Sequence, residues 1–217
     1  MDILKFDSPL MQKLALLFDL MVLNVLTVLL SLPIVTIGAA TTALYDATWR
    51  LKHNRGTMLK DYWRTFCSNL KQATVIWLFL LLLGALLVYN LLLFIGGQEG
   101  MGLMVIPMIL GAVVWVVVFA WVFVLQSRFQ NKVTQTVINA LLCGLRFLPQ
   151  TIAASVLNLG PWVLLATVPE AFYKLGLIWA LFWFGFAAYS NICLLDRPLR
   201  ILSSPQEDAP AAEAADT

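Results

Sequence analysis

The sequence predicts an all-α polytopic membrane protein with about five transmembrane helices and two amphipathic helices on the cytoplasmic surface. Of its 217 residues, 61% are hydrophobic and 12% are charged, against about 45–50% and 25% in soluble domains. The apolar residues arrive in blocks of about 20, which is the length that a helix needs to cross about 30 Å of hydrocarbon. The basic residues lie between these blocks, on alternate connections.

Five blocks have the length of a membrane span. They run from Leu14 to about Ile37, Ala73 to Ile95, Leu103 to Leu125, Gln150 to Val168, and Leu175 to Leu195. The second and third blocks contain no charged residue, and the glycine-rich stretch "GGQEGMG" joins them. The fourth and fifth are joined by "PEAFYK". These short connections predict two helical hairpins, because lipid offers no partner to a bare amide and each span must be a helix.

The stretch from Ser31 to Arg50 has two interpretations. In the first, the opening span ends between Pro33 and Gly38, and the chain lies on the inner surface by Trp49. That gives five crossings with the N-terminus outside. In the second, the chain turns at Leu32-Pro33 and residues 34–49 return as a short helix of small residues, shielded by the other spans. That gives six crossings with both ends inside. The first is the simpler expectation, because a proline commonly kinks a membrane helix without reversing the chain.

Charge asymmetry predicts the orientation. Eleven of the 14 Lys and Arg residues fall in 50–71, in 126–148 and after the last span. By the positive-inside rule these segments face the cytoplasm. We therefore expect a multi-pass protein of the cytoplasmic membrane with a cytoplasmic C-terminus.

Two of the basic segments have the pattern of an amphipathic interfacial helix. After Gly56, aromatic and leucine residues share one arc of about 100° while cations cluster about 120° away. Residues 128–147 repeat this arrangement. Such helices bind anionic headgroups. The cations of this predicted basic interface are Lys60, Arg64, Lys71, Arg128, Lys132 and Arg146.

The order of interfacial helix and hairpin occurs twice, over 57–125 and 128–195, which indicates a duplicated unit inside one transmembrane domain of residues 1–202. Residues 203–217 read as a disordered acidic tail.

Three polar residues inside the spans are candidates for an intramembrane site. Asp19 is a carboxylate within the first span, Asn24 lies on a helix face with Thr27 and Ser31, and Asn158 precedes Gly160-Pro161. Intramembrane acids are costly and therefore suggest function. The alternatives are that Asp19 is hydrated near the interface, and that the amides and hydroxyls bond neighbouring helices.

Catalysis is not expected. The sequence has one histidine, His53, three widely spaced cysteines, and no catalytic or metal-binding motif. We therefore predict neither enzyme activity, nor a cofactor, nor a metal site. The net charge of +2 gives no argument for nucleic-acid binding.

The chain resembles the YesL family of bacterial membrane proteins, also called domain of unknown function 624, from about Asp7 to Arg200. The resemblance rests on Asp19 and Asn24, on "SLPIVTIG" from Ser31, on "TALY" from Thr42, and on "FCSNLKQAT" from Phe66. It implies an integral membrane protein encoded beside carbohydrate importers, without an established activity.

Three functions follow as hypotheses. The first is a non-enzymatic accessory or regulatory component of carbohydrate uptake, which contacts an importer through its basic helices. The second is a small transporter or channel for a polar solute or ion, which uses Asp19, Asn24 and Asn158 and acts as a homo-oligomer. The third is a membrane-organising protein whose cationic helices bind anionic lipid.

Overall fold

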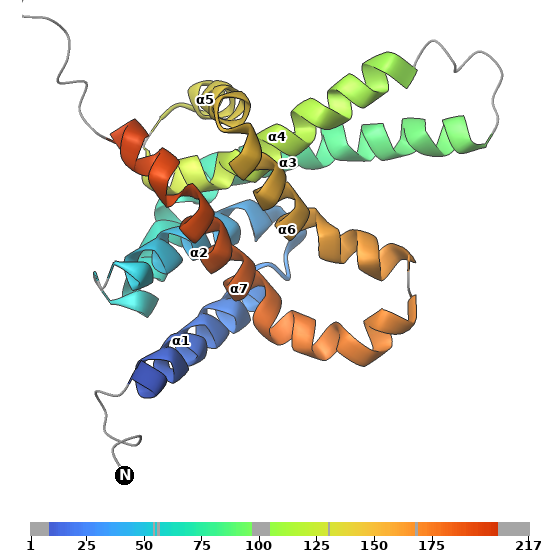
Figure 1. The fold of residues 1–217 in the computed structure, drawn as a ribbon. Helices are drawn as coiled ribbons and strands as arrows, with labels where there is room; N and C mark the ends of the chain where they lie inside the picture. The colour runs from blue at the N-terminus through green and yellow to red at the C-terminus, as the bar shows by residue number, and fades with distance from the viewer. Residues whose placement is uncertain are drawn as a thin grey trace, which may run out of the picture.

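The computed structural model describes residues 9–53, 55, 57–96, 105–129, 131–167 and 169–203, and these residues are helical with no strand among them (Figure 1). The elements follow one another as α1 (Pro9–Leu30), the short 3-10 helix η1 (Ile34–Thr36), α2 (Ile37–Lys52), α3 (Met58–Ile95), α4 (Val105–Arg128), α5 (Val133–Arg146), α6 (Leu148–Thr167) and α7 (Pro169–Ser203). The acidic tail and most of the "GGQEGMG" connection lie outside the described residues.

The first apolar block ends at Leu30, and the chain turns before it re-enters the fold as α2. Pro33 adopts an extended conformation, and the Thr36 hydroxyl donates to the carbonyls of Leu30 and Pro33. Residues Gly38 to Thr48 of α2 are then almost wholly buried. The helix that follows Pro33 is thus a short helix of small residues packed among the other helices, a feature of the second interpretation, and the chain becomes half-buried at Trp49 and Arg50.

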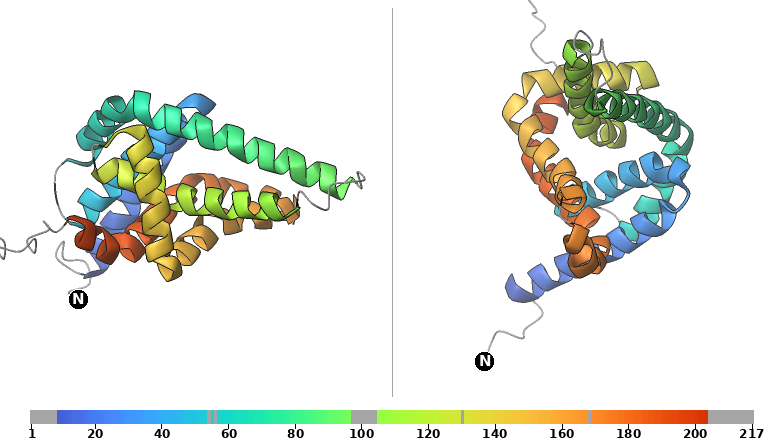
Figure 2. Two further views of the ribbon diagram at one scale, coloured as in Figure 1. Left: turned by 90° about the horizontal axis from the view of Figure 1, so that it is seen from above. Right: turned by 90° about the vertical axis from the view of Figure 1, so that its right-hand side faces the viewer.

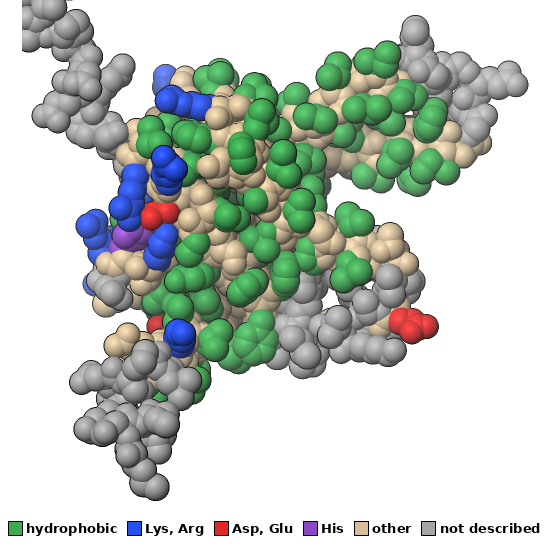
Figure 3. Space-filling view, in the orientation of Figure 1, with side chains coloured by type: hydrophobic (Ala, Val, Ile, Leu, Met, Phe, Trp, Pro, Cys, Tyr) green, Lys and Arg blue, Asp and Glu red, His purple; other side chains and the backbone are tan. Residues whose placement is uncertain are grey.

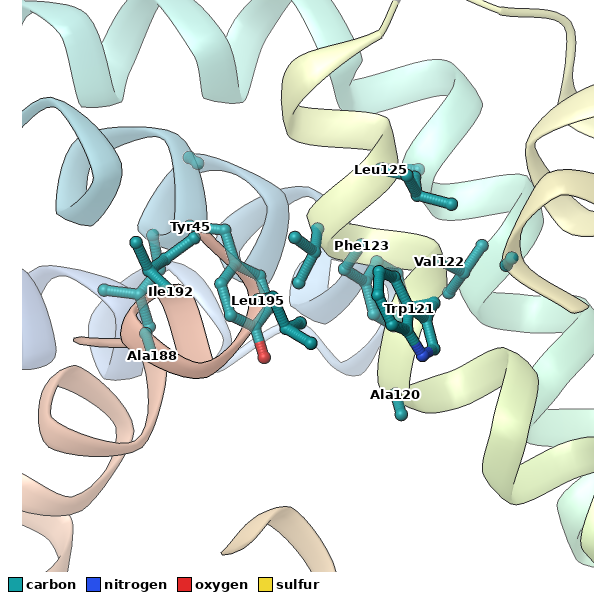
Figure 4. Packing of buried hydrophobic residues seen from close by; sticks show 14 of the residues in the cluster. Tyr45, Ala120, Trp121, Val122, Phe123, Leu125, Ala188, Ile192 and Leu195 are labelled. Atoms are coloured by element: carbon teal, nitrogen blue, oxygen red, sulfur yellow. The ribbon is translucent and has the colours of Figure 1, made fainter. Parts of the chain in front are cut away.

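Helix α2 is the centre of the packing, with α1, α3, α4 and α7 all in contact with it. Its small side chains allow close approach: a Cβ atom on Gly38 would lie 2.4 Å from the Ala73 carbonyl oxygen of α3. On another face, Figure 4 shows the Tyr45 ring beside Ile192 and Leu195 of α7. Lipid tails are as apolar as the side chains, so burying apolar area gives helices in a membrane little stability. Close van der Waals packing is therefore what stabilises their association.

Three helices meet at a buried hydroxyl group. The hydroxyl of Tyr62 on α3 lies 3.1 Å from the Thr27 hydroxyl of α1 and donates to the Ala40 carbonyl of α2 at 3.2 Å. Thr27 thus bonds a neighbouring helix, as its place on the polar face of α1 indicates.

Helix α3 corrects the prediction of a separate interfacial helix after Gly56. The chain is one continuous helix from Met58 to Ile95, 38 residues long, or about 57 Å at 1.5 Å per residue. The predicted aromatic face is divided, because Tyr62 and Phe66 are buried while Leu59 and Trp63 are exposed. The first turns of α3 therefore pack part of this face on protein, against α2.

The second predicted amphipathic segment does form a separate helix. Helix α5 meets α6 at an angle of 109° after a break at Phe147. Its small residues Ala140 and Gly144 face the protein, and a Cβ on Gly144 would lie 2.2 Å from Val117 of α4. A further face of α5 exposes leucine and isoleucine side chains, namely Ile138, Leu142 and Leu145.

The connection "PEAFYK" is helical and forms the first turns of α7, so the predicted loop there is wrong. Only residue 168 separates α6 from α7. Further along α7, Gly185 crosses α1 so closely that a Cβ atom would lie 2.5 Å from the Leu20 carbonyl oxygen.

The architecture is that of a membrane protein. Among the described residues, Met11–Leu30, Met58–Ile95 and Val105–Arg128 are long and apolar enough to cross a membrane, and α5 and α6 together would add a fourth segment. The distal parts of α3 and α4 project from the helix cluster as a hairpin, and α6 and α7 project in the same general direction (Figures 1 and 2). Large apolar side chains cover the distal part of α3.

Replacing Gly185 with Ala is expected to destabilise the protein by about 1–3 kcal/mol, the usual cost of overpacking. The added methyl group meets the Leu20 backbone, which cannot rotate away. Thermal unfolding in detergent measures the effect as a Tm lowered by several degrees. Gly160→Ala is the control, because nothing lies within 4 Å of a Cβ there and alanine favours a helix. An equal Tm loss in both variants would contradict the interpretation.

Candidate functional site

Two of the three predicted intramembrane residues form hydrogen bonds to neighbouring helices. The Asn24 side chain is fully buried, and its Oδ1 accepts a hydrogen bond of 2.9 Å from the Gly185 backbone N–H of α7. The Asn158 Oδ1 accepts from Asn191 at 2.8 Å, and the Asn191 amide also donates to the Tyr45 hydroxyl at 3.1 Å. These amides hold helices together, as their alternative reading predicts.

Asp19 is half-buried on α1. Across the residues that the structure describes, Asp19 forms no ion pair with a lysine, arginine or histidine side chain. The hydrogen bonds of Asn24 with Gly185 and of Asn158 with Asn191 do not involve Asp19.

Cationic side chains gather at one end of the molecule, which we call the basic end (Figure 3). Helices α2, α4, α5 and α7 each carry a basic residue in their last turn. Cations stabilise a helix C-terminus because the backbone dipole is negative there. Of the six cations predicted for the basic interface, Arg128 is half-buried, and the other five are exposed: Lys60, Arg64, Lys71, Lys132 and Arg146.

A buried carboxylate organises this end. Asp46 of α2 is 2% exposed, and its Oδ2 accepts from Arg50 Nε at 2.9 Å and from the Thr65 hydroxyl at 2.7 Å. Its Oδ1 lies 3.4 Å from an Arg128 guanidinium nitrogen. Asp46 thus links α2, α3 and α4. A buried charge with several partners is costly to leave unpaired.

The Trp49 ring lies next to this network and contacts the side chains of Arg128 and His53. The Arg128 guanidinium lies 3.5 Å from its centroid, in cation–π geometry. The His53 ring stacks on Trp49 with centroids 4.3 Å apart, and His53 Nδ1 lies 2.8 Å from the Trp49 carbonyl oxygen. Arg55 lies 5.6 Å from the same ring.

Asp196 of α7 supplies the second carboxylate. It pairs with Lys52 at 3.1 Å, with Arg200 at 3.0 Å and with His53 at 3.6 Å. Burial opposes its ionisation, but the Lys52 hydrogen bond and the charges of Lys52, Arg200 and His53 outweigh burial and hold the pKa of Asp196 below its ordinary value. The group is therefore a carboxylate at neutral pH, and it ties the end of α7 to the end of α2.

These residues enclose a recess of about 350 Å³, which we call the Trp49 recess. Its lining consists of Trp49, His53, Arg55, Arg128, Phe129, Asp196, Leu199 and Arg200. The arrangement is suited to binding an anion, because guanidinium groups present several N–H donors in fixed geometry. In the part of the chain that the structure describes, no group of three or more His, Cys, Asp or Glu side chains is placed to hold a metal ion.

Sequence reasoning identified Arg128 but missed the rest of the recess. The sequence pattern places the chain on the surface by Trp49 and gives His53 no role, whereas His53 contacts Asp196 of a helix that lies far away in the sequence. One signal was present for Asp46. A carboxylate four residues before Arg50, in a helix of small residues, predicts an ion pair that is buried with the helix.

Replacing Asp46 with Ala is expected to destabilise the protein by about 1.5–3 kcal/mol, the range for hydrogen bonds to charged groups. The change leaves Arg50, Arg128 and Thr65 without their acceptor. Chemical or thermal unfolding in detergent provides the measurement. Arg64→Ala serves as the control and should change stability by less than about 1 kcal/mol, because the Arg64 side chain is 65% exposed. A wild-type Tm for Asp46→Ala would refute the organising role of this carboxylate.

Comparison with known proteins finds one family model that matches part of the chain. Residues 20–91 match the family model described as protein of unknown function, DUF624. The match includes Asn24, Asp46 and Thr65, and it ends before α4. No curated protein and no solved structure matches the chain. The match over residues 20–91 is consistent with the predicted resemblance to a YesL-type DUF624 protein.

Proposed function

We propose that this protein is a non-enzymatic accessory or regulatory component of carbohydrate uptake, which binds a partner in the membrane through its basic end. The observation that carries the proposal is the gathering of cations at one end of the structure, where helices α2, α4, α5 and α7 end. The link to carbohydrate uptake comes from the family resemblance.

The proposal places the basic end in the cytoplasm of a bacterium, at the inner face of the cytoplasmic membrane. The positive-inside rule supports this orientation, as does the occurrence of Arg200 in the last turn of α7, beside Trp49, Arg55 and Arg128. The C-terminus is then cytoplasmic.

The proposed topology has six crossings, with the N-terminus also inside. In Figures 1 and 2, α1 begins at the end of the molecule where α2 and α7 finish. Helix α2 has 16 residues, or about 24 Å, and its burial among other helices suits a short crossing that touches little lipid. The first turns of α3 and the whole of α5 are then the cytoplasmic and interfacial parts.

The exposed cations suit contact with a protein more than chemistry on a substrate. Lys60 and Lys132 are exposed on α3 and just before α5, and charged rims steer association and select partners. The alternative function, transport of a polar solute or ion, has less support because Asn24 and Asn158 are engaged in hydrogen bonds between helices.

Compartment-specific reporters are expected to place both chain ends in the cytoplasm. At both the N-terminus and the C-terminus, a reporter that works only in the cytoplasm should be active. A reporter that works only outside the cytoplasm should be inactive at both ends. A reporter inserted after Gly96, where α3 has ended, is the control and should report from the opposite compartment. An external N-terminus would exclude six crossings.

A photo-crosslinking residue at Lys60 or Lys132 is expected to capture an importer subunit in native membranes. The same residue at Leu82, whose side chain is 71% exposed on the distal part of α3, is the control and should capture none. Deletion of the gene should lower uptake of the imported sugar. Capture of no importer subunit together with unchanged uptake would overturn the proposal. Solute flux in proteoliposomes that is lost in Asp19→Ala would favour the transporter instead.

A further inference from the structure

The Trp49 recess carries more positive than negative charge. Three arginines line it, Arg55, Arg128 and Arg200, against one carboxylate, Asp196. That carboxylate already pairs with Lys52 and Arg200. A concave surface with excess positive charge concentrates anions and strengthens their binding.

Two of the arginines keep hydrogen-bonding capacity for a ligand. Arg128 contacts Asp46 only at 3.4 Å, while Asp46 holds its closer partners Arg50 and Thr65 at 2.9 and 2.7 Å. Among the residues that the structure describes, Arg55 forms no ion pair with a carboxylate. A guanidinium has five N–H donors, so a single long contact leaves most of those on Arg128 available.

The recess is also held in shape before any ligand binds. The Arg128 guanidinium lies 3.5 Å from the Trp49 ring centroid, and His53 stacks on the same ring. Asp196 joins α7 to the last turn of α2 through Lys52. Because these contacts restrict the side chains already, a ligand loses less affinity to ordering them.

We propose that the Trp49 recess binds an anion that carries a phosphate group. A phosphate monoester has three terminal oxygens and a phosphodiester has two, and in both they point in different directions, which suits donors from separate elements: the connection after α2 and the end of α4. A carboxylate is planar and is satisfied by one guanidinium fork. The volume of about 350 Å³ falls in the range of small-molecule sites. The phosphate belongs either to an anionic phospholipid headgroup or to a soluble phosphomonoester, and the basic end suits both.

This inference goes beyond the proposed function, because it concerns ligand binding in the recess and not partner binding. It can be tested on the purified full chain without a partner. Calorimetric titration in detergent with inorganic phosphate and with glucose 6-phosphate tests the soluble source. Native mass spectrometry after extraction from vesicles of phosphatidylcholine and phosphatidylglycerol at about 4:1 tests the lipid source. The first variant is Arg55→Gln, because Arg55 is exposed and its replacement leaves the Asp46 network intact. The second variant is Arg128→Gln. Arg64→Gln is the control, since it removes the same charge outside the recess.

Binding through the recess predicts that Arg55→Gln weakens phosphate or phosphatidylglycerol binding about tenfold, equivalent to about 1.4 kcal/mol, while Arg64→Gln has little effect. Saturable binding of either soluble probe assigns the soluble source, and retained phosphatidylglycerol alone assigns the lipid source. The absence of both, an equal loss in Arg64→Gln, or equally tight binding of acetate would overturn the proposal. Partner capture at Lys60 or Lys132 does not depend on these results, so the two proposals fail separately.

Discussion

The close packing of one small-residue helix, α2, against its neighbours is the constraint on which the rest of the structure depends. A helix in lipid gains little from burying apolar area, so packing distance and hydrogen bonds decide which helices associate. Alanine and glycine along α2 permit the approach of α3 at Gly38. The same burial requires that every polar group on α2 finds a partner, and Tyr45 and Asp46 find theirs on α3, α4 and α7.

This requirement joins the packing to the basic end. Asp46 needs cations because it is buried, and it obtains them from its own helix and from the last residue of α4. Arg128 is consequently held over Trp49. The recess therefore lies beside a buried charge and its partners, and its lining comes from the ends of α2, α4 and α7 and from the residues that follow α2 and α4.

Local pattern was sufficient to predict the helices, the membrane environment and the clustering of cations, because each depends on short stretches of sequence. For example, the length of the first and third apolar blocks predicts two helices, which the structure contains as α1 with 22 residues and α4 with 24. Continuity was harder to predict. The amphipathic pattern after Gly56 describes a helix correctly, but nothing in the pattern shows that Tyr62 faces α2 instead of lipid, or that the helix runs on without a break into the apolar block. The site was harder still, since Trp49 and Asp196 are almost 150 positions apart, and only the fold brings them to one recess.

The unbroken length of α3 has a mechanical consequence. From Met58 to Leu83 this helix contains neither proline nor glycine, the residues at which helices usually bend. A tilt imposed on its apolar half by a thinner or thicker bilayer therefore swings its first turns as part of the same rod. Those turns carry Thr65, which donates a hydrogen bond to the buried carboxylate of Asp46 on α2, so a change in the tilt of α3 displaces a group that is bonded to α2.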